Sequence, residues 1–172
     1  MRESIKAPLV LTVISAAVCG MLAFANALTA DKIAQTEQAA LQESLTQAFG
    51  EAEYTALPQQ YEGIHQVIRD TDGRLIFDVT SSGYEKDGQH LLIGLDAEGA
   101  VCGICVVSIA DSPTQAAKVQ EDAFLSQFLG RQKATDAYDA IAGATKSAQG
   151  IQNAVNLVLE TYQTNKEAMT HG

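Results

Sequence analysis

The chain has 172 residues, of which 47% are hydrophobic and 19% are charged, and its formal net charge at pH 7 is −10. This length fits one globular domain with an additional segment. Nucleic-acid phosphates attract surfaces rich in lysine and arginine, so an acidic chain without a basic run excludes nucleic-acid binding.

The N-terminal segment differs from the rest because residues 7–30 contain no charged side chain. A helix of this length rises about 36 Å, which exceeds a hydrocarbon core of about 30 Å. We therefore predict that residues 1–30 form a short cytoplasmic stub and a transmembrane anchor. Arg2 and Lys6 precede the apolar stretch, so the positive-inside rule places the N-terminus in the cytoplasm and the following chain outside. A cleaved signal peptide is the alternative, since Ala-Asn-Ala at 25–27 fits a cleavage site.

A juxtamembrane helix is predicted next, within residues 31–50. Asp31 is a candidate N-cap and Gly50 a stop. The apolar positions have amphipathic helical spacing and are Ile33, Ala40, Leu41, Leu45, Ala48 and Phe49.

The remaining residues, 51–172, begin with a β-rich part. Turn sequences at 71–73 and 96–99 each separate two apolar runs, which indicates two hairpins. Loops are predicted at 81–88 and 110–118. The four predicted strands lie within 63–70, 73–81, 89–96 and 100–109.

Two helices follow the predicted strands. The first lies within 119–130 and has an apolar face of Phe124, Leu125, Phe128 and Leu129. The second runs from about Ser147 to Thr164, with a stripe of Ile151, Ala154, Val155, Val158, Leu159 and Tyr162. This order predicts an α+β domain in which helices flank an antiparallel sheet.

Cys102 and Cys105 form the pattern Cys-Gly-Ile-Cys in the last predicted strand. Residues three apart on a strand point to opposite faces, which suits neither a disulfide nor a metal chelate. We therefore expect cysteines of the protein core. His65, His90 and His171 are far apart in sequence, and no metal site is predicted.

The stretch DAIAGATKSAQ at 139–149 is a turn of small residues that leads into the last helix. Gly143 permits a positive φ or a close approach, and Thr145 lies at or just before the helix start. Thr145 or Ser147 could simply cap the helix. Exposed amides at a helix N-terminus also favour a phosphate, which a hydroxyl there could bind or carry covalently.

These residues resemble the signature of FMN-binding domains in which a flavin transferase joins FMN to a threonine through a phosphoester. The signature is Asp, two variable residues, Ser or Thr, then Gly-Ala-Thr. It falls here on Asp139, Ala142, Gly143, Ala144 and Thr145. Further stretches follow in the family's order: Gly-Tyr at 83–84, GLDAEGAVCGICVVS, DSPTQAAKV, FLSQFLG and IQNAVNLVLE. With its N-terminal anchor, the chain is similar to the G subunits of Rnf (Rsx) ion-translocating electron-transport complexes. The C subunits of sodium-translocating NADH:quinone reductases are related.

The resemblance implies specific roles for residues of this chain. Thr145 would carry the FMN phosphate, and the flavin transferase would recognise Asp139, Gly143 and Ala144. The flavin or its phosphate would also contact Gly143, Ala144, Lys146, Ser147, Tyr84, Ser112 and Thr114. The chain departs from the family's sequence pattern at two places. Ala142 replaces a Ser or Thr, and the stretch 111–116 lacks the family's two glycines.

The function that this resemblance implies is electron relay through covalent FMN. The chain would belong to an ion-translocating ferredoxin/NAD oxidoreductase complex in the inner membrane, and would not be catalytic alone. Its partners would be the other membrane subunits, the flavin transferase and the lipid bilayer. The alternatives are an extracytoplasmic FMN-dependent reductase, the C subunit of a sodium-translocating NADH:quinone reductase, and a non-redox anchored binding domain.

Overall fold

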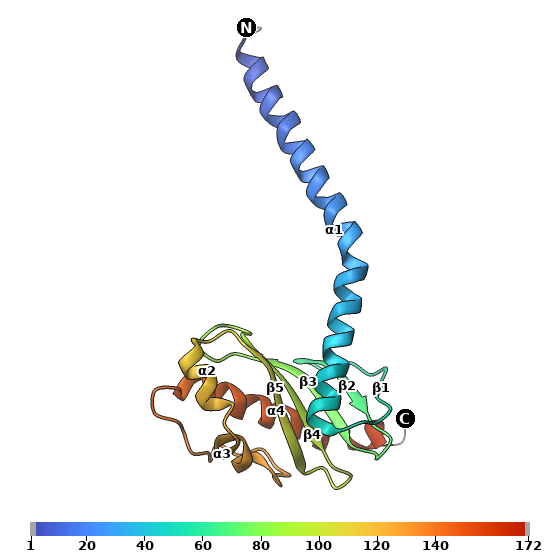
Figure 1. The fold of residues 1–172 in the computed structure, drawn as a ribbon, viewed down its shortest axis with the longest axis vertical. Helices are drawn as coiled ribbons and strands as arrows, with labels where there is room; N and C mark the ends of the chain where they lie inside the picture. Colours follow the sequence, from blue (N-terminus) through green and yellow to red (C-terminus); the bar gives the residue numbers. More distant parts are fainter. Residues whose placement is uncertain (1–2, 171–172) are drawn as a thin grey trace. The chain divides into compact units, whose positions relative to one another are not determined.

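The computed structural model describes residues 3–170. The chain divides after Glu43 into two compact units. Arg2 and His171 lie outside the described residues. A single helix, α1 (Glu3–Phe49), contains both predicted N-terminal helical segments (Figure 1). Among the residues whose side chains are described, no helix is both long enough and apolar enough to cross a membrane. The anchor at 7–30 stays a prediction.

The sheet of the second unit has five antiparallel strands in the order β1-β2-β3-β4-β5. Both predicted hairpins are confirmed, and each is closed by an aspartate after its first strand. Asp70 Oδ1 accepts hydrogen bonds from the amides of Asp72 and Arg74, and Asp96 Oδ1 accepts one from the amide of Ala100 at 2.7 Å. The strands are β1 (Thr55–Ala56), β2 (Ile64–Arg69), β3 (Leu75–Ser81), β4 (Gln89–Leu95) and β5 (Val101–Ile109). The two-residue β1 was not predicted.

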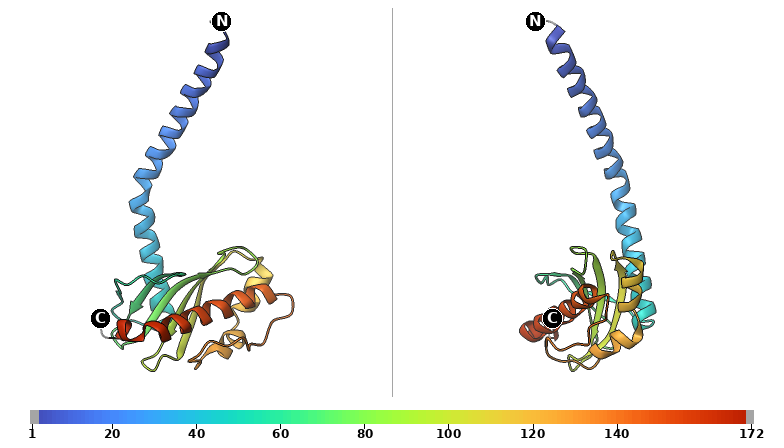
Figure 2. Two further views of the ribbon diagram at one scale, coloured as in Figure 1. Left: turned by 180° about the vertical axis from the view of Figure 1, so that it is seen from behind. Right: turned by 90° about the vertical axis from the view of Figure 1, so that its left-hand side faces the viewer.

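The main core lies between one face of this sheet and α4 (Thr145–Thr170), which runs across β3 and β4 (Figure 2). Alternate residues of β3 and β4 face α4, because side chains on a strand point to opposite faces in turn. The predicted apolar stripe of α4 is confirmed, since all six of its side chains are buried. Burial of this stripe fixes the helix, and with it Thr145, on the sheet.

The other face of the sheet is covered in part by the last turn of α1. The side chains buried between this turn and the sheet are Leu45, Phe49, Ile68, Ile76 and Leu92. The ring of Phe49 lies against Gly94 and Gly103, and a Cβ atom at Gly94 would come within 2.4 Å of it. Arg74 Nη2 also donates to the carbonyl of Phe49 at 3.0 Å.

The segment after β5 differs from its prediction. The loop expected at 110–118 contains α2 (Pro113–Val119), because Pro113 stands in the first turn, where proline is tolerated in a helix. The helix expected at 119–130 is shorter, comprising α3 (Asp122–Leu125) and the 3₁₀ turn η1 (Ser126–Phe128). Glu121 has an extended backbone, with ψ 136°, and therefore separates α2 from α3.

The prediction of core cysteines is wrong. β5 is the edge strand of the sheet, so Cys102 is exposed and Cys105 is half-buried. A shift in the pairing of β4 with β5 makes Cys102 an extra residue, which breaks the expected alternation. The Cys102 sulfur lies 3.1 Å from the position of a Cβ atom at Gly94, and Cys105 pairs with the buried Leu92. Both thiols therefore lie on the face that Phe49 covers.

Candidate functional site at the start of helix α4

The turn before α4 presents Thr145 as the first residue of the helix. Gly143 has φ +81°, in the left-handed region that glycine adopts most readily. The Ala144 amide then donates to the carbonyl of Ile141 at 3.0 Å, and the Ala148 amide donates to that of Ala144 at 2.9 Å. Ala144 is buried in the main core, so the turn is fixed directly before Thr145.

The Thr145 side chain is exposed, and its hydroxyl has no hydrogen-bond partner among residues 3–170. Ser147 lies beneath it and is buried, and its hydroxyl donates to Oδ2 of Asp111. Neither hydroxyl therefore caps α4 in the contacts that the structure describes. The capping interpretation has no support, and the Thr145 oxygen is accessible from solvent.

Groups of positive charge or partial charge lie near this hydroxyl. Within the described backbone, the amides of Thr145, Lys146 and Ser147 donate to no carbonyl, so they carry the positive end of the helix dipole. Lys118, at the end of α2, donates from Nζ to the carbonyl of Ala142 at 3.0 Å. Its sequence position gave no signal of this role, because residues 118 and 142 meet only through the fold.

Asp111 joins the start of α4 to two loops. Its Oδ1 accepts from the amides of Tyr84 at 3.0 Å and Glu85 at 3.3 Å, and its Oδ2 accepts from Ser147 and from Gln89 Nε2. Burial alone would raise the pKa of Asp111, but the hydrogen bonds from Ser147, Glu85, Gln89 and Tyr84 outweigh it and hold the pKa below its ordinary value. A charged carboxylate is thus fixed below the first turn of α4.

Gln89 is fully buried beside Asp111 and fills the space that two glycines leave. Its Nε2 also donates to the carbonyl of Ser147 at 3.0 Å. A Cβ atom at Gly83 would lie 2.3 Å from Gln89 Nε2, and one at Gly150 would lie 2.3 Å from Gln89 Oε1. Because glycine has no side chain, the loop before Tyr84 and helix α4 can both pack against the side-chain amide of Gln89.

Tyr84 lies at the rim of the site and is 64% exposed. Lys146 Nζ lies 5.4 Å from the centroid of its ring, which is a cation–π distance. The structure therefore brings Tyr84, Lys146, Ser147 and Thr145 together, although Tyr84 is far from the others in sequence.

Ser112 and Thr114 are less closely connected to the site. Ser112 precedes α2, and its carbonyl accepts from the amides of Gln115 and Ala116, both at 2.9 Å. Both hydroxyl residues are exposed. Across the described part of the chain, no hydrogen bond links either residue to Thr145.

The segment before Gly143 is held by Gln127. Its Oε1 accepts from the Asp139 amide at 2.7 Å, and its Nε2 donates to the Asp139 carbonyl at 3.4 Å. The Asp139 side chain remains exposed. A cavity of about 430 Å³ adjoins this segment and is lined by Lys118, Glu121, Ala123, Phe124, Gln127, Asp139, Ala140 and Ile141.

The histidines come together more closely than their sequence separation suggests. The ring centroids of His65 and His90 are 6.2 Å apart, and His90 Nε2 lies 2.6 Å from Asp78 Oδ1. The hydrogen bond to Asp78 raises the pKa of His90 against the opposing effect of burial. Among the described residues, no three histidine, cysteine, aspartate or glutamate side chains gather as a metal site would require.

Comparison with known families agrees with this arrangement. Residues 83–160 match the FMN-binding domain, a range that includes Tyr84, Asp111, Lys118 and Thr145. The chain thus contains an FMN-binding domain. Residues 1–48 match the RnfG N-terminal region, and the two matches together are those of an RnfG-like subunit of an Rnf complex. No curated protein matches the chain.

Proposed function

We propose that this RnfG-like protein carries FMN as a phosphoester on Thr145 and relays electrons within an Rnf-type ion-translocating complex. The observation that carries the proposal is the exposed, unbonded hydroxyl of Thr145 at the first residue of α4. The match of residues 83–160 to the FMN-binding domain supports FMN as the ligand. The flavin, when bound, supplies the electron-transfer chemistry, and the chain's residues hold and orient it.

The residues around Thr145 fit a phosphate ester. The unbonded amides of the first turn of α4 are donors for phosphate oxygens. Lys118 and Lys146 lie near the first turn of α4 and offset the charge of the phosphate. Tyr84 offers an exposed ring beside Lys146, against which a flavin can pack. Ser112 and Thr114 remain candidates for weaker contacts on the adjoining loop.

The proposed covalent step is a phosphoryl transfer. The Thr145 oxygen attacks the phosphorus of an activated FMN donor, and the bond from that phosphorus to its leaving phosphate or nucleotide breaks. The hydroxyl proton passes to a base of the flavin transferase. We propose that this enzyme recognises Asp139, Gly143 and Ala144, because Asp139 and Gly143 are exposed in the segment that leads to Thr145. Lys118 donates to the backbone carbonyl of Ala142, a contact that does not depend on the side chain at this position. The replacement of Ser or Thr by Ala142 leaves the Thr145 hydroxyl, the attachment oxygen, in place.

We also propose that residues 7–30 anchor the protein in the inner membrane, with the FMN domain on the extracytoplasmic side. Large apolar side chains along α1 are exposed between Val10 and Phe24, including Leu11 at 66% and Phe24 at 68%. Such side chains suit a hydrocarbon environment or the helices of other membrane subunits. A tethered and covalently bound flavin cannot diffuse away from neighbouring redox centres, which suits an electron relay.

The direct test is the intact mass of protein purified from membranes that contain a flavin transferase, together with in-gel flavin fluorescence after denaturation. We expect one added FMN phosphoester in the native chain and none in Thr145→Ala. Thr145→Ser keeps a hydroxyl and should retain some flavin. Thr71→Ala is the matched control and should be fully modified, because Thr71 is exposed and lies outside the residues that match the FMN-binding domain. Unmodified native protein, or flavin retained in Thr145→Ala, would refute the proposal.

A further inference from the structure

The outer edge of β5 is open to another strand. β5 pairs with β4 on one side and is the edge strand of the sheet. On its outer side, Val101 bonds with the backbone of Gly130 at 2.8 Å and Arg131 at 2.9 Å. Beyond this point, residues 102–109 have no outer backbone partner within the described chain. These residues span about 26 Å, at about 3.3 Å each, and unpaired edges of this kind attract extended segments.

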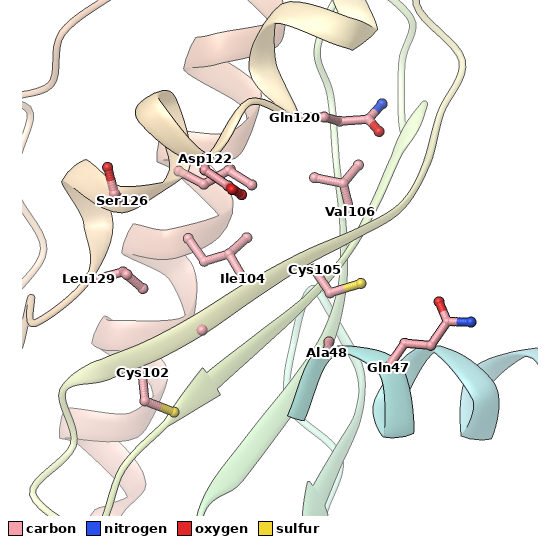
Figure 3. A pocket seen from close by; sticks show the side chains of 12 residues that line it. Gln47, Ala48, Cys102, Ile104, Cys105, Val106, Gln120, Asp122, Ser126 and Leu129 are labelled. Carbon is pink, nitrogen blue, oxygen red and sulfur yellow. The ribbon is translucent and has the colours of Figure 1, made fainter. Parts of the chain in front are cut away.

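A cavity of about 510 Å³ follows this edge (Figure 3). Gln47 and Ala48 of α1 line one side, and Asp122, Ser126 and Leu129 line the other. Figure 3 shows Ile104 directed toward α3 and η1, whereas Cys105 is directed toward α1. The edge is therefore a groove with a wall on each side.

The residues on the two sides of the groove restrict which binding partner can fit there. Pairing with β5 of a second copy would bring that copy's own two walls to the same place, within a strand spacing of about 4.8 Å. A single extended segment brings no such walls. The bonds of Val101 to Gly130 and Arg131 show that this edge accepts backbone hydrogen bonds from outside the sheet, and the groove continues directly from them.

The side chains of the groove define the chemistry of the segment. Leu129 is 47% exposed, and Leu125 is half-buried beside it, so this wall favours apolar side chains. Asp122 lies on the same wall with Glu121 next to it, and both are exposed in a chain of net charge −10. Among the residues that the structure describes, no lysine or arginine lines the cavity. A segment with alternate apolar residues and flanking basic residues complements these features.

We propose that the edge of β5 is a docking site for an extended, basic-flanked segment of a partner protein, which binds by β-augmentation. The segment adds a sixth strand to the sheet along residues 102–109. Its apolar side chains pack on Leu125 and Leu129, and its basic residues meet Asp122 and Glu121. This site is separate from Thr145 and does not depend on bound flavin.

The test uses the full chain carrying Thr145→Ala in lipid nanodiscs, so that flavin plays no part. The probe is the capped peptide acetyl-Lys-Thr-Val-Thr-Val-Thr-Lys-amide, in which the valines and both lysines point to the same side of an extended strand. We expect slower amide hydrogen exchange in β5 when the peptide is bound. Asp122→Lys and Leu129→Lys should each raise the dissociation constant of the peptide by at least tenfold. Asp136→Lys reverses an exposed charge outside the groove and should change the dissociation constant less than twofold.

Two control peptides test the backbone pairing and the charge contacts separately. A peptide with alternate amides N-methylated cannot complete the strand hydrogen bonds and should not protect β5. A peptide with Glu in place of Lys should bind at least tenfold more weakly. Equal binding of the N-methylated peptide, or no protection of β5 at millimolar peptide, overturns the proposal. Protection that instead rises with protein concentration alone would assign the edge to a second copy and also overturn it.

Discussion

Asp111 connects three segments of the site through one carboxylate, and its charge is therefore coupled to stability. The hydrogen bonds it accepts hold its pKa below the ordinary value. The resulting stabilisation is complete above the unfolded pKa of about 3.9 and is lost as the pH falls through the lower folded pKa. We expect Asp111→Asn to lower the free energy of unfolding at pH 7 by about 2 kcal/mol, since hydrogen bonds to charged groups contribute about 1.5–3 kcal/mol.

This prediction has a pH signature. Urea unfolding of the native chain and Asp111→Asn should show their largest difference at neutral pH, and the difference should shrink in acid below about pH 4. Asp139→Asn is the control, because the Asp139 side chain is exposed, and it should change stability by less than about 0.5 kcal/mol. A difference that does not depend on pH would contradict the role of the Asp111 charge.

Gly150 is a second residue whose substitution should be costly. Alanine normally stabilises a helix interior relative to glycine by about 1 kcal/mol. Here the added Cβ atom would lie 2.3 Å from Gln89 Oε1 and 2.8 Å from the carbonyl oxygen of Ser82. We therefore expect Gly150→Ala to destabilise the protein by about 1–3 kcal/mol. Gln149→Ala, on the exposed side of the same turn, should be neutral or stabilising in thermal unfolding.

Among the elements, the last turn of α1 is attached to the sheet mainly by Phe49. Its side chain is buried against two glycines of β4 and β5. Phe49→Ala should lower the free energy of unfolding by about 3–5 kcal/mol, as expected for a large cavity in a core. Gln47→Ala, on the exposed side of the same turn, should have little effect. An unchanged denaturation midpoint in Phe49→Ala would show that this turn is not part of the cooperative fold.

The elements also show which parts of the fold could be predicted from the sequence. The hairpins and α4 follow from local signals, namely turn residues and helical periodicity. The position of β5 at the edge depends on strand order, which local patterns do not encode, so Cys102 and Cys105 were misplaced. The motif predicts the candidate site, but it does not predict the contacts that support it. Gln89 and Ser147 are 58 residues apart, and Lys118 and Ala142 are 24 apart. Such pairs meet only after the chain has folded.

For the whole molecule, the division into two compact units at residues 43 and 44 predicts an independently folding fragment. Residues 44–172 retain Leu45, Phe49 and the complete main core. We expect this fragment to unfold in one cooperative transition with coincident far-UV and near-UV circular dichroism. A matched fragment beginning at residue 51 lacks Phe49 and should be less stable by an amount similar to Phe49→Ala. A fragment 44–172 without a cooperative transition would refute this prediction.

The two hydrogen bonds between Gln127 and the backbone of Asp139 have a consequence for the order of events in biogenesis. They fix the segment that leads to Thr145 in the folded chain, so under the proposed function the entropic cost of ordering this loop is met during folding and not during recognition by a flavin transferase. The proposed flavin attachment can then follow folding. Under this proposal, cells in which flavin is scarce should accumulate a folded protein without flavin, which can be completed later without new synthesis.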